Sequence, residues 1–318
     1  MRILKFGGKS LSSVEKTQKI CKNIQKIYKK EKELIIVVSA IGSTTDNLTS
    51  LANTYGYSSS SKKELAKLLS TGETVSASLF VIMLQSMGLP AKSFSAYDLN
   101  ISTFGDPLNS KIAYINKKPI LDAFKTNTIC VVAGFQGINK NNEITLLGRG
   151  GSDTTAAALG AVFDTDVEIY SDFAGVFSGD PRFLNYKKLK CANYSVLINM
   201  AKAGAKVLDS SAVTLAQNHN IKIISKSSTQ PNLSGTTISN IESDVVAISS
   251  ISNLCEICIC FSNSKKLKFI IKNVLFVLND VKFYNFNIEI DKINFLINES
   301  DKLKILSILS NKLNLTKK

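Results

Sequence analysis

The sequence has one histidine among its 318 residues, and this scarcity restricts the chemistry available to it. That residue, His219, lies in a Gln-Asn-His-Asn run before a strand-like segment, which indicates the end of a helix. A single histidine in such a position excludes a Ser-His-Asp triad and a metal site built on two histidines. We therefore expect chemistry that does not depend on an imidazole base.

Cysteine is also scarce, with six in the chain, and three of the six fall within residues 255–260. A structural zinc site takes four nitrogen or sulfur ligands, usually as two spaced pairs, and no second pair or histidine follows this segment. The segment is instead typical of a buried strand, in which cysteine acts as a small hydrophobic residue. We predict structural cysteines and no protein metal site.

Long hydrophobic runs are missing as well. No apolar stretch approaches the roughly 18–20 residues of a membrane-spanning helix, so we expect no membrane partner. The strand-like segment 2–6 begins directly after Met1 and leaves no room for a signal peptide, which predicts a cytoplasmic protein. The hydrophobic fraction of 44% is sufficient for a core, and the length allows two domains.

Acidic residues are outnumbered, with 25 Asp and Glu against 39 Lys and Arg, giving a net charge of +14. This excess is spread along the chain, and no RNP-like aromatic motif or zinc finger accompanies it. The lysines at 16, 19, 22, 26 and 30 fall on one face of a predicted helix, opposite an apolar stripe. We interpret them as a solvated face and expect no nucleic-acid partner, although nucleic-acid binding stays as a minor alternative.

Strand-like and helix-like segments alternate over the first 240 residues, which predicts an α/β domain with an open, mostly parallel sheet between helices. A Ser- and Gly-rich loop is expected at 53–61 and a hairpin at 134–147. Strands are predicted at 2–6, 34–39, 91–95, 129–133, 167–170 and 221–225, and helices at 14–30, 45–54, 64–87, 154–163 and 210–219.

The amino-acid composition changes near residue 240, where short predicted strands rich in Ile, Phe and Asn begin. We therefore divide the chain into a domain at 1–240 and a small α+β domain at 241–318. Strands in the second domain are predicted at 254–261, 282–290 and 292–297, and helices at 265–278 and 301–313.

Two glycine-containing segments are similar to known nucleotide-binding motifs, but the spacing of their residues does not match those motifs. A Walker P-loop ending at Ser10 requires glycine at position 3, where the chain has Ile3. The run Asp172-Phe173-Ala174-Gly175 matches a protein-kinase D-F-G motif only if one residue is deleted, and the chain has no H-R-D. Neither of these two nucleotide-binding motifs is present.

The same turns nevertheless suit anion binding. A strand carrying Lys5 leads into Gly7 and Gly8, and Ser10 is placed to cap the helix that follows. The run Gly-Arg-Gly-Gly-Ser-Asp at 148–153 opens an Ala-rich helix in the same way. Glycines admit a ligand close to the backbone, and a helix N-terminus offers free N–H groups to an anion. Each turn alone is equally well explained as a tight strand-to-helix connection; together they favour transfer between anions.

Here the chain resembles the aspartate kinases of the amino-acid-kinase superfamily. The run K-F-G-G-K-S at 5–10 resembles their K-F-G-G-T-S opening, and S-A at 39–40 with T-T-D at 44–46 resembles a second element. Further elements follow in the family's order: T-G-E at 71–73, G-R-G-G-S-D at 148–153, S-D…G-V-F…D-P-R at 171–182, G-A-K-V-L at 204–208, and the closing Pro231 with Gly235-Thr236.

The resemblance implies an ATP- and Mg²⁺-dependent enzyme that phosphorylates the side-chain carboxylate of L-aspartate, with an ACT-type C-terminal module and with a homodimer as the candidate assembly. It implies catalytic roles for Lys5, Asp153 and Lys206. By the same resemblance, aspartate would be held by Thr45, Glu73, Arg149, Ser152 and Asp153. ATP would be held by Lys5, Gly7, Gly8, Ser10, Ser171, Asp172, Phe177, Arg182 and Lys206.

Several positions depart from the family pattern. Lys9 replaces a threonine, Phe177 replaces a tyrosine, and Asp209-Ser210 replaces His-Pro. About 75 C-terminal residues suffice for one ACT-type module where most of the family has two. A non-catalytic regulatory subunit and a carboxylate kinase acting on glutamate therefore stay as alternatives.

An aspartate acceptor agrees with the near absence of histidine. A carboxylate with an ordinary pKa near 3.9 is already ionised at pH 7, so its attack on a phosphorus atom needs no general base. The difficulty is the approach of an anion to a triphosphate, which fixed cations and backbone N–H groups relieve. Lys5, Lys206 and Mg²⁺ would supply the positive charge.

Overall fold

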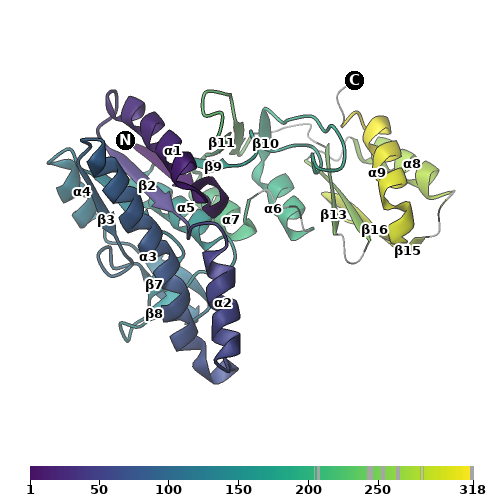
Figure 1. Cartoon of the computed structure of the whole chain (residues 1–318). Helices are drawn as coiled ribbons and strands as arrows, with labels where there is room; N and C mark the ends of the chain where they lie inside the picture. The colour runs from purple at the N-terminus through teal and green to yellow at the C-terminus, as the bar shows by residue number, and fades with distance from the viewer. Residues whose placement is uncertain are drawn as a thin grey trace.

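The computed structural model describes residues 1–203, 205, 208–241, 246–251, 255–262, 266–279, 281 and 283–315. A large α/β body forms the N-terminal part, and a small α+β unit lies beside it at the C-terminal end (Figure 1). The predicted fold class is confirmed for both parts.

The body is built on an eight-stranded sheet. Among the described strands of this sheet, only β11 and β12 pair antiparallel, and the other neighbours pair parallel. In spatial order the strands are β10 (Cys191–Asn193), β12 (Thr236–Ser239), β11 (Ile223–Ser227), β9 (Val167–Ser171), β1 (Arg2–Phe6), β2 (Leu34–Val38), β6 (Ile129–Ala133) and β3 (Ala91–Phe94). The six strands predicted for this domain all form, within two residues of the expected bounds.

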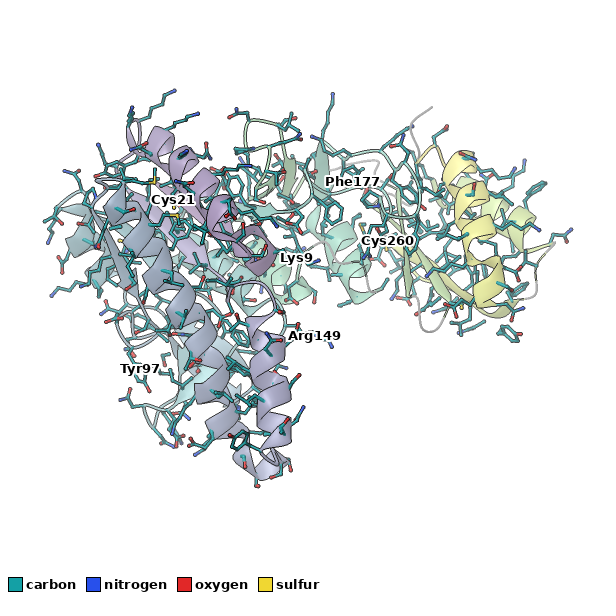
Figure 2. The ribbon with its side chains drawn as sticks, in the orientation of Figure 1. Lys9, Cys21, Tyr97, Arg149, Phe177 and Cys260 are labelled. Carbon is teal, nitrogen blue, oxygen red and sulfur yellow. The ribbon has the colours of Figure 1, made fainter. Side chains whose placement is uncertain are left out.

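Helices cover both faces of this sheet, so its central strands are apolar on both sides. One face is covered by α1 (Val14–Tyr28) and α3 (Lys62–Ser86), which pack on Leu4 and Phe6 of β1. The predicted apolar stripe of α1 is buried at Ile20, Cys21 and Ile24, and Figure 2 labels Cys21 beside this helix.

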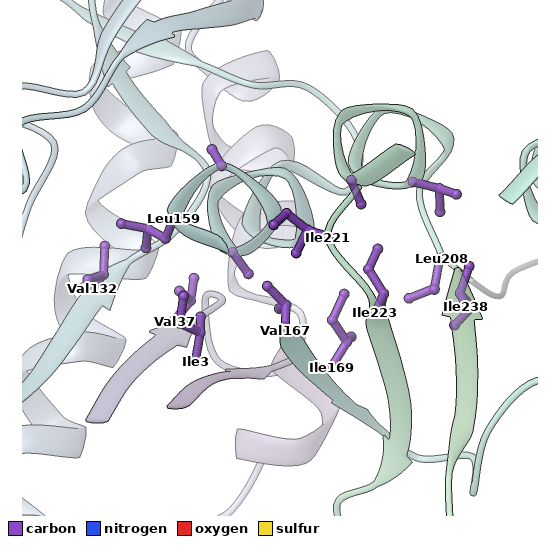
Figure 3. Packing of buried hydrophobic residues seen from close by; sticks show 14 of the residues in the cluster. Ile3, Val37, Val132, Leu159, Val167, Ile169, Leu208, Ile221, Ile223 and Ile238 are labelled. Carbon is purple, nitrogen blue, oxygen red and sulfur yellow. The ribbon is translucent and has the colours of Figure 1, made fainter. Parts of the chain in front are cut away.

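The opposite face is covered by α5 (Gly151–Phe163) and α7 (Ser210–Asn218). Figure 3 shows Leu159 of α5 over Ile3, Val37 and Val167 of three neighbouring strands. Side chains alternate along a strand, so Lys5 lies on the same face as Ile3. The lysine therefore points from β1 toward the start of α5.

A second sheet extends the body beside α3. It has the order β5-β4-β7-β8, with β4 (Ser102–Asp106), β5 (Asn109–Tyr114), β7 (Gln136–Ile138) and β8 (Ile144–Leu146). The predicted hairpin is confirmed because β7 and β8 pair antiparallel. The β4–β5 hairpin and the short helix α4 (Lys118–Phe124) were missed.

The stretch 53–61, predicted as a loop, contains the end of α2 (Thr44–Thr54) and the 3-10 helix η2 (Ser59–Ser61). Within the described residues one helical run, Ser59–Ser86, is long and apolar enough to cross a membrane by length and composition alone. The expectation that no such stretch exists is therefore wrong. Half of the most apolar part of this run is buried, and its residues Phe80 and Leu84 pack against the large sheet on the face that α1 also covers. This is expected for a core helix.

The described residues of the C-terminal unit form a four-stranded antiparallel sheet with two α-helices. Its strands lie in the order β13 (Val246–Ile251), β14 (Glu256–Phe261), β16 (Lys292–Ile297) and β15 (Phe283–Ile288); its helices are α8 (Leu267–Leu278) and α9 (Lys302–Lys312), the latter preceded by the 3-10 helix η4 (Glu299–Asp301). The strand β13 was missed. The other strands and both helices agree with the predicted α+β unit.

The two faces of this small sheet pack against different partners. Ile257 and Ile259 of β14 face the core formed with α8 and α9. Cys258 and Cys260 face the other way and belong to the core of the large body, next to α6 (Tyr194–Lys202). The predicted buried strand is confirmed here, and its cysteines pack as small apolar side chains between the two parts.

Candidate active site

An ion pair joins the first strand to the first turn of α5. Lys5 Nζ lies 2.5 Å from Asp153 Oδ1, and the two side chains are only 10% and 12% exposed. Burying either charge alone would be costly, so each stabilises the other. The structure thus brings together one residue of the first motif and one residue of the motif at 148–153.

The backbone turns sharply after β1. The Gly7 N–H donates to the Tyr170 carbonyl at 3.4 Å, and the Gly8 carbonyl accepts from the Gly42 N–H at 3.0 Å. A Cβ on Gly8 would lie 2.3 Å from the Ala40 carbonyl oxygen, which a real side chain cannot do. Glycine at position 8 therefore allows the β1 and β2 ends to approach closely.

Ser10 does not cap α1, contrary to the prediction. It lies inside the 3-10 helix η1 (Gly8–Leu11), and Ser13 is the residue that accepts from the Lys16 N–H at the start of α1. The Ser10 hydroxyl instead donates to Ser228 Oγ at 2.9 Å, just beyond β11. This bond joins the turn after β1 to the segment that follows β11.

The second glycine turn opens α5 as expected. Gly148 and Gly150 have φ values of 74° and 64°, a left-handed conformation that favours glycine. A Cβ on Gly150 would lie 2.0 Å from the Cβ of Asp209, which caps α7 by accepting from the Ser211 N–H. Asp209, one of the departures from the family pattern, thus packs directly on the turn that carries Arg149.

Glu73 is buried in the middle of α3 with only 3% of its surface exposed. Its Oε1 accepts from the Ala40 N–H at 3.0 Å, and its Oε2 has no hydrogen-bond partner among the described residues. Burial raises the pKa of this carboxyl to about 7, because desolvation outweighs the backbone hydrogen bonds and the charge of Lys5. An unpartnered buried carboxylate oxygen is poised to accept a ligand cation or donor.

These groups line one cavity of about 490 Å³. Six of the predicted site residues contribute to its wall: Lys5, Gly8, Thr45, Glu73, Arg149 and Ser152. Asp153 contacts the cavity through Lys5. Sequence reasoning missed the apolar part of the wall, formed by Leu69, Leu108, Phe135 and Leu146. Their signal is weak, because apolar residues of strands and helices are expected in any core.

Only some of the residues predicted to bind the nucleotide lie close together in the structure. Ser171 ends β9, and its carbonyl accepts from the Ser228 N–H at 2.8 Å, so Ser171 and Ser10 are both tied to Ser228. Asp172 follows as an exposed residue. These groups lie at the carboxyl edge of β9, β1 and β11, where open α/β sheets bind ligands.

Phe177 and Arg182 lie elsewhere, in the long segment between β9 and β10. Figure 2 shows Phe177 between the large sheet and the C-terminal unit, apart from Arg149, and its ring packs on the C-terminal core. Arg182 is exposed and pairs with Asp180. Neither residue lines the cavity of 490 Å³. Lys206 lies outside the described residues.

The comparisons agree with this geometry. The model of the amino acid kinase family matches residues 1–225, well over half of the chain. The chain belongs to the amino acid kinase family. Its similarity to aspartokinases is specific: Aspartokinase 2 of Bacillus subtilis is 40% identical over 230 residues, 72% of this chain and 56% of that protein. The aspartokinase of Rickettsia felis is 36% identical over 264 residues, 80% of this chain and 66% of that protein.

This member of the amino acid kinase family thus spans little more than half the length of its Bacillus relative. Its fold is that of a solved aspartokinase. The E. coli aspartokinase III in complex with aspartate and ADP superposes with a TM-score of 0.84 at 17% identity, over 99% of this chain and 100% of that one.

Proposed function

We propose that the chain transfers the γ-phosphoryl group of ATP to the side-chain carboxylate of L-aspartate, giving 4-phospho-L-aspartate. This reaction opens the aspartate-family amino-acid pathway toward lysine or diaminopimelate, threonine and methionine, and we expect it in the cytoplasm. The observation that supports it best is that Lys5, Glu73 and Arg149 line the same cavity. The aspartokinase relatives and the aspartate–ADP complex of the E. coli protein support the same substrates.

The charges around the cavity suit a dicarboxylate that carries an ammonium group. Arg149 is exposed on its turn, and its planar guanidinium can bind one carboxylate through two parallel hydrogen bonds. The unpartnered Oε2 of Glu73 suits the substrate ammonium. The remaining carboxylate would then lie toward Lys5, which lines the same cavity.

The proposed transfer needs no proton to be removed from the acceptor. A carboxylate oxygen forms a bond to the γ-phosphorus, and the bond from that phosphorus to the oxygen bridging the β- and γ-phosphorus atoms breaks. ADP leaves with the electron pair of the broken bond. Lys5 stabilises the charge that spreads over the transferring oxygens, because Asp153 holds its ammonium group in place. The backbone N–H of Gly8 would add a fixed dipole, whereas that of Gly7 already donates to the Tyr170 carbonyl.

Mg²⁺ fits this arrangement as a companion of the nucleotide. No group of three or more His, Cys, Asp or Glu able to enclose an ion occurs among the described residues. Mg²⁺ commonly keeps several waters and binds through substrate phosphates with one or two carboxylates, so a protein cage is not required. When bound with ATP it neutralises charge on the β- and γ-phosphate oxygens. We assign no residue of this chain to it.

A scan of amino-acid acceptors with ATP and Mg²⁺ tests the proposal. Trapping the acyl phosphate with hydroxylamine should give a hydroxamate with L-aspartate and much less with L-glutamate. A product with glutamate alone would make the chain a glutamate kinase. If neither aspartate nor glutamate raised the rate of ADP release above the rate measured without an acceptor, the chain would be a non-catalytic subunit. A product with glutamate alone, or no stimulation by either acceptor, would refute the assignment.

We also propose a homodimer formed through the edge of the C-terminal sheet. The edge strand β15 has no charged residue and exposes Phe283, Tyr284 and Ile288 by 44%, 60% and 42%. An unprotected edge strand pairs readily with a second chain, and a two-fold axis would close the contact. Light scattering should give the mass of two chains, and Ile288→Lys should give one; a monomeric parent protein would refute the dimer.

A further inference from the structure

Lys9 borders the cavity of 490 Å³, and the proposed function gives it no role so far. It follows Gly8 in η1 and contributes to the cavity wall together with Lys5 and Arg149. Figure 2 labels Lys9 and Arg149 in the large body. The resemblance to the aspartate kinases leads us to expect threonine here. The chain thus has a third cationic residue at a cavity in which two anionic substrates are expected to meet.

The backbone of Lys9 is held in place, whereas its side chain is exposed. The Lys9 carbonyl accepts from Ser12 Oγ at 2.9 Å and from Lys16 Nζ at 3.2 Å. No carboxylate among the described residues pairs with the Lys9 ammonium group, in contrast to that of Lys5. Lysine carries its charge on a flexible four-carbon stem. The ammonium group of Lys9 can therefore reach a ligand in the cavity from a fixed starting point.

The charge of Lys5 is already balanced before a substrate binds. Its ammonium group lies 2.5 Å from Asp153 Oδ1, so at a distance the pair contributes little net charge. The residues of the cavity wall include one further carboxyl group, that of Glu73. A transferring phosphoryl group spreads negative charge over its three outer oxygens. A cation without a carboxylate partner, next to Lys5 on the same turn, would stabilise these oxygens.

The neighbours of Lys9 indicate which part of the nucleotide it meets. Glu73 and Arg149, which we propose to hold the acceptor, line the same cavity as Lys9. Ser171 and Asp172, which are predicted to bind the nucleotide, do not line it. Transfer requires the γ-phosphorus to meet the acceptor carboxylate, so the terminal phosphate is the part of ATP that enters this cavity. A cation in the cavity wall therefore meets the γ-phosphoryl oxygens.

We propose that Lys9 is a further phosphate-binding residue, whose ammonium group contacts the γ-phosphoryl oxygens of ATP. This inference rests on the proposed function, from which it takes the identity of the two substrates. Lys5 and Lys9 then act from opposite ends of the glycine turn at 7–8, one paired with a carboxylate and one unpaired. The affinity of the chain should depend on whether the nucleotide carries a third phosphate.

Two other roles for Lys9 make different predictions. If it is only a solvated surface lysine, removing its charge leaves every ligand affinity unchanged. If it binds the acceptor, the KM for aspartate rises and nucleotide affinities stay constant. If it binds the γ-phosphoryl group, affinity for a triphosphate falls, affinity for ADP stays constant, and the KM for aspartate changes little.

The test compares Lys9→Gln with Lys16→Gln in the full chain. Both substitutions remove one positive charge from an exposed lysine of the same surface, but Lys16 does not line the cavity. The probes are ADP and the ATP analogue with nitrogen between its β- and γ-phosphorus atoms, each titrated calorimetrically with Mg²⁺. Lys9→Gln should bind the analogue about tenfold more weakly and ADP within about twofold of the parent chain. Lys16→Gln should bind both like the parent.

Lys9→Arg keeps the charge and should restore most of the affinity for the analogue. Unchanged affinity of folded Lys9→Gln for the analogue would overturn the proposal, as would an equal loss for ADP or an equal loss in Lys16→Gln. Absence of analogue binding by the parent chain would overturn it too. Because these titrations contain no acceptor, failure to phosphorylate aspartate would refute the proposed function, while the comparison of analogue with ADP still decides the role of Lys9.

Discussion

Lys5 and Asp153 meet at 2.5 Å although they belong to the first strand and to a helix in the middle of the chain. The pairing follows from topology. Strand β1 lies at the centre of the large sheet, and α5 begins at its carboxyl end on the face to which Lys5 points. The ammonium group is thus fixed before any substrate arrives, so little reorganisation is left for the reaction itself.

Replacing Lys5 should remove catalysis while the fold survives. Lys5→Met keeps the apolar stem of the side chain and removes the charge, so kcat should fall by about 10²–10³ or more. Coupled ADP-release assays with saturating aspartate measure the loss, and circular dichroism checks the fold. Near-normal turnover in a folded variant would contradict the role of Lys5.

The partner charge supplies the control for that variant. Lys5→Met leaves the Asp153 carboxylate buried without its cation, which costs about 3–5 kcal/mol when a buried pair is broken. The double variant with Asp153→Asn should recover much of this stability in urea denaturation and none of the activity. Recovery of activity would show that Lys5 serves only to neutralise Asp153.

Glu73 should make the protein less stable as the pH rises from about 5 to 8. Its pKa is about 7 in the folded protein, above its ordinary value of 4.5, so in this window the native state binds more protons than the unfolded state. Stability therefore declines with rising pH, by up to about 3 kcal/mol from this group. Urea denaturation at pH 5 and pH 8 should show a smaller decline for Glu73→Gln; an identical decline would contradict the assignment.

The same carboxyl should govern the pH dependence of aspartate binding. Only the ionised form of Glu73 attracts an ammonium group, so the KM for aspartate should fall as the pH rises from 6 to 8. In Glu73→Gln the KM should be higher and should lose most of this dependence. A parallel change in the KM for ATP would instead indicate a general effect of pH on the fold.

Gly7 and Gly8 should respond differently to alanine. At Gly8 a Cβ would lie 2.3 Å from the Ala40 carbonyl, so Gly8→Ala should destabilise the fold and shift the β1 turn. At Gly7 the nearest atom would be Lys5 Nζ at 3.6 Å, so Gly7→Ala should fold normally and lose affinity for ADP. Melting temperature and ADP titration separate the two effects; equal melting temperatures would contradict the steric explanation.

Much of the large sheet could be predicted from the sequence. The doubly buried strands are short apolar runs with clear ends, and β1 and β6 have the predicted bounds. The motif order was sufficient to identify Lys5, Glu73 and Arg149, which do share one cavity. Where a signal is local, such as a glycine turn followed by a helix, the sequence contains it.

Features that depend on distant packing could not be predicted. The β4–β5 hairpin is polar and exposed, so its sequence shows no regular alternation of apolar residues. Its position is set by the pairing of β4 with β7. Ser10 was assigned to the helix beside it because its partner, Ser228, lies more than 200 positions away. Phe177 follows the motif but packs on a core formed mostly by residues beyond 240.

Gln136 is a further residue that sequence reasoning missed, and its substitution should weaken aspartate binding. The side chain is 2% exposed, and its Nε2 donates to the Ser70 carbonyl at 2.7 Å and to Thr74 Oγ1 at 2.9 Å. These two acceptors lie on α3 on either side of Glu73. Gln136→Leu removes both bonds, so α3 should lose its fixed position against the β7 strand and the KM for aspartate should rise severalfold.

Gln85→Leu is the matched control, because the Gln85 amide binds the Ala91 carbonyl at 3.0 Å near the other end of α3. Each variant should lose about 1–3 kcal/mol of stability, since each leaves buried acceptors without their donor. Only Gln136→Leu should raise the KM for aspartate, and kcat should change little because Lys5 is untouched. If both variants left this KM at the parent value, the amide of Gln136 would stabilise α3 without orienting Glu73.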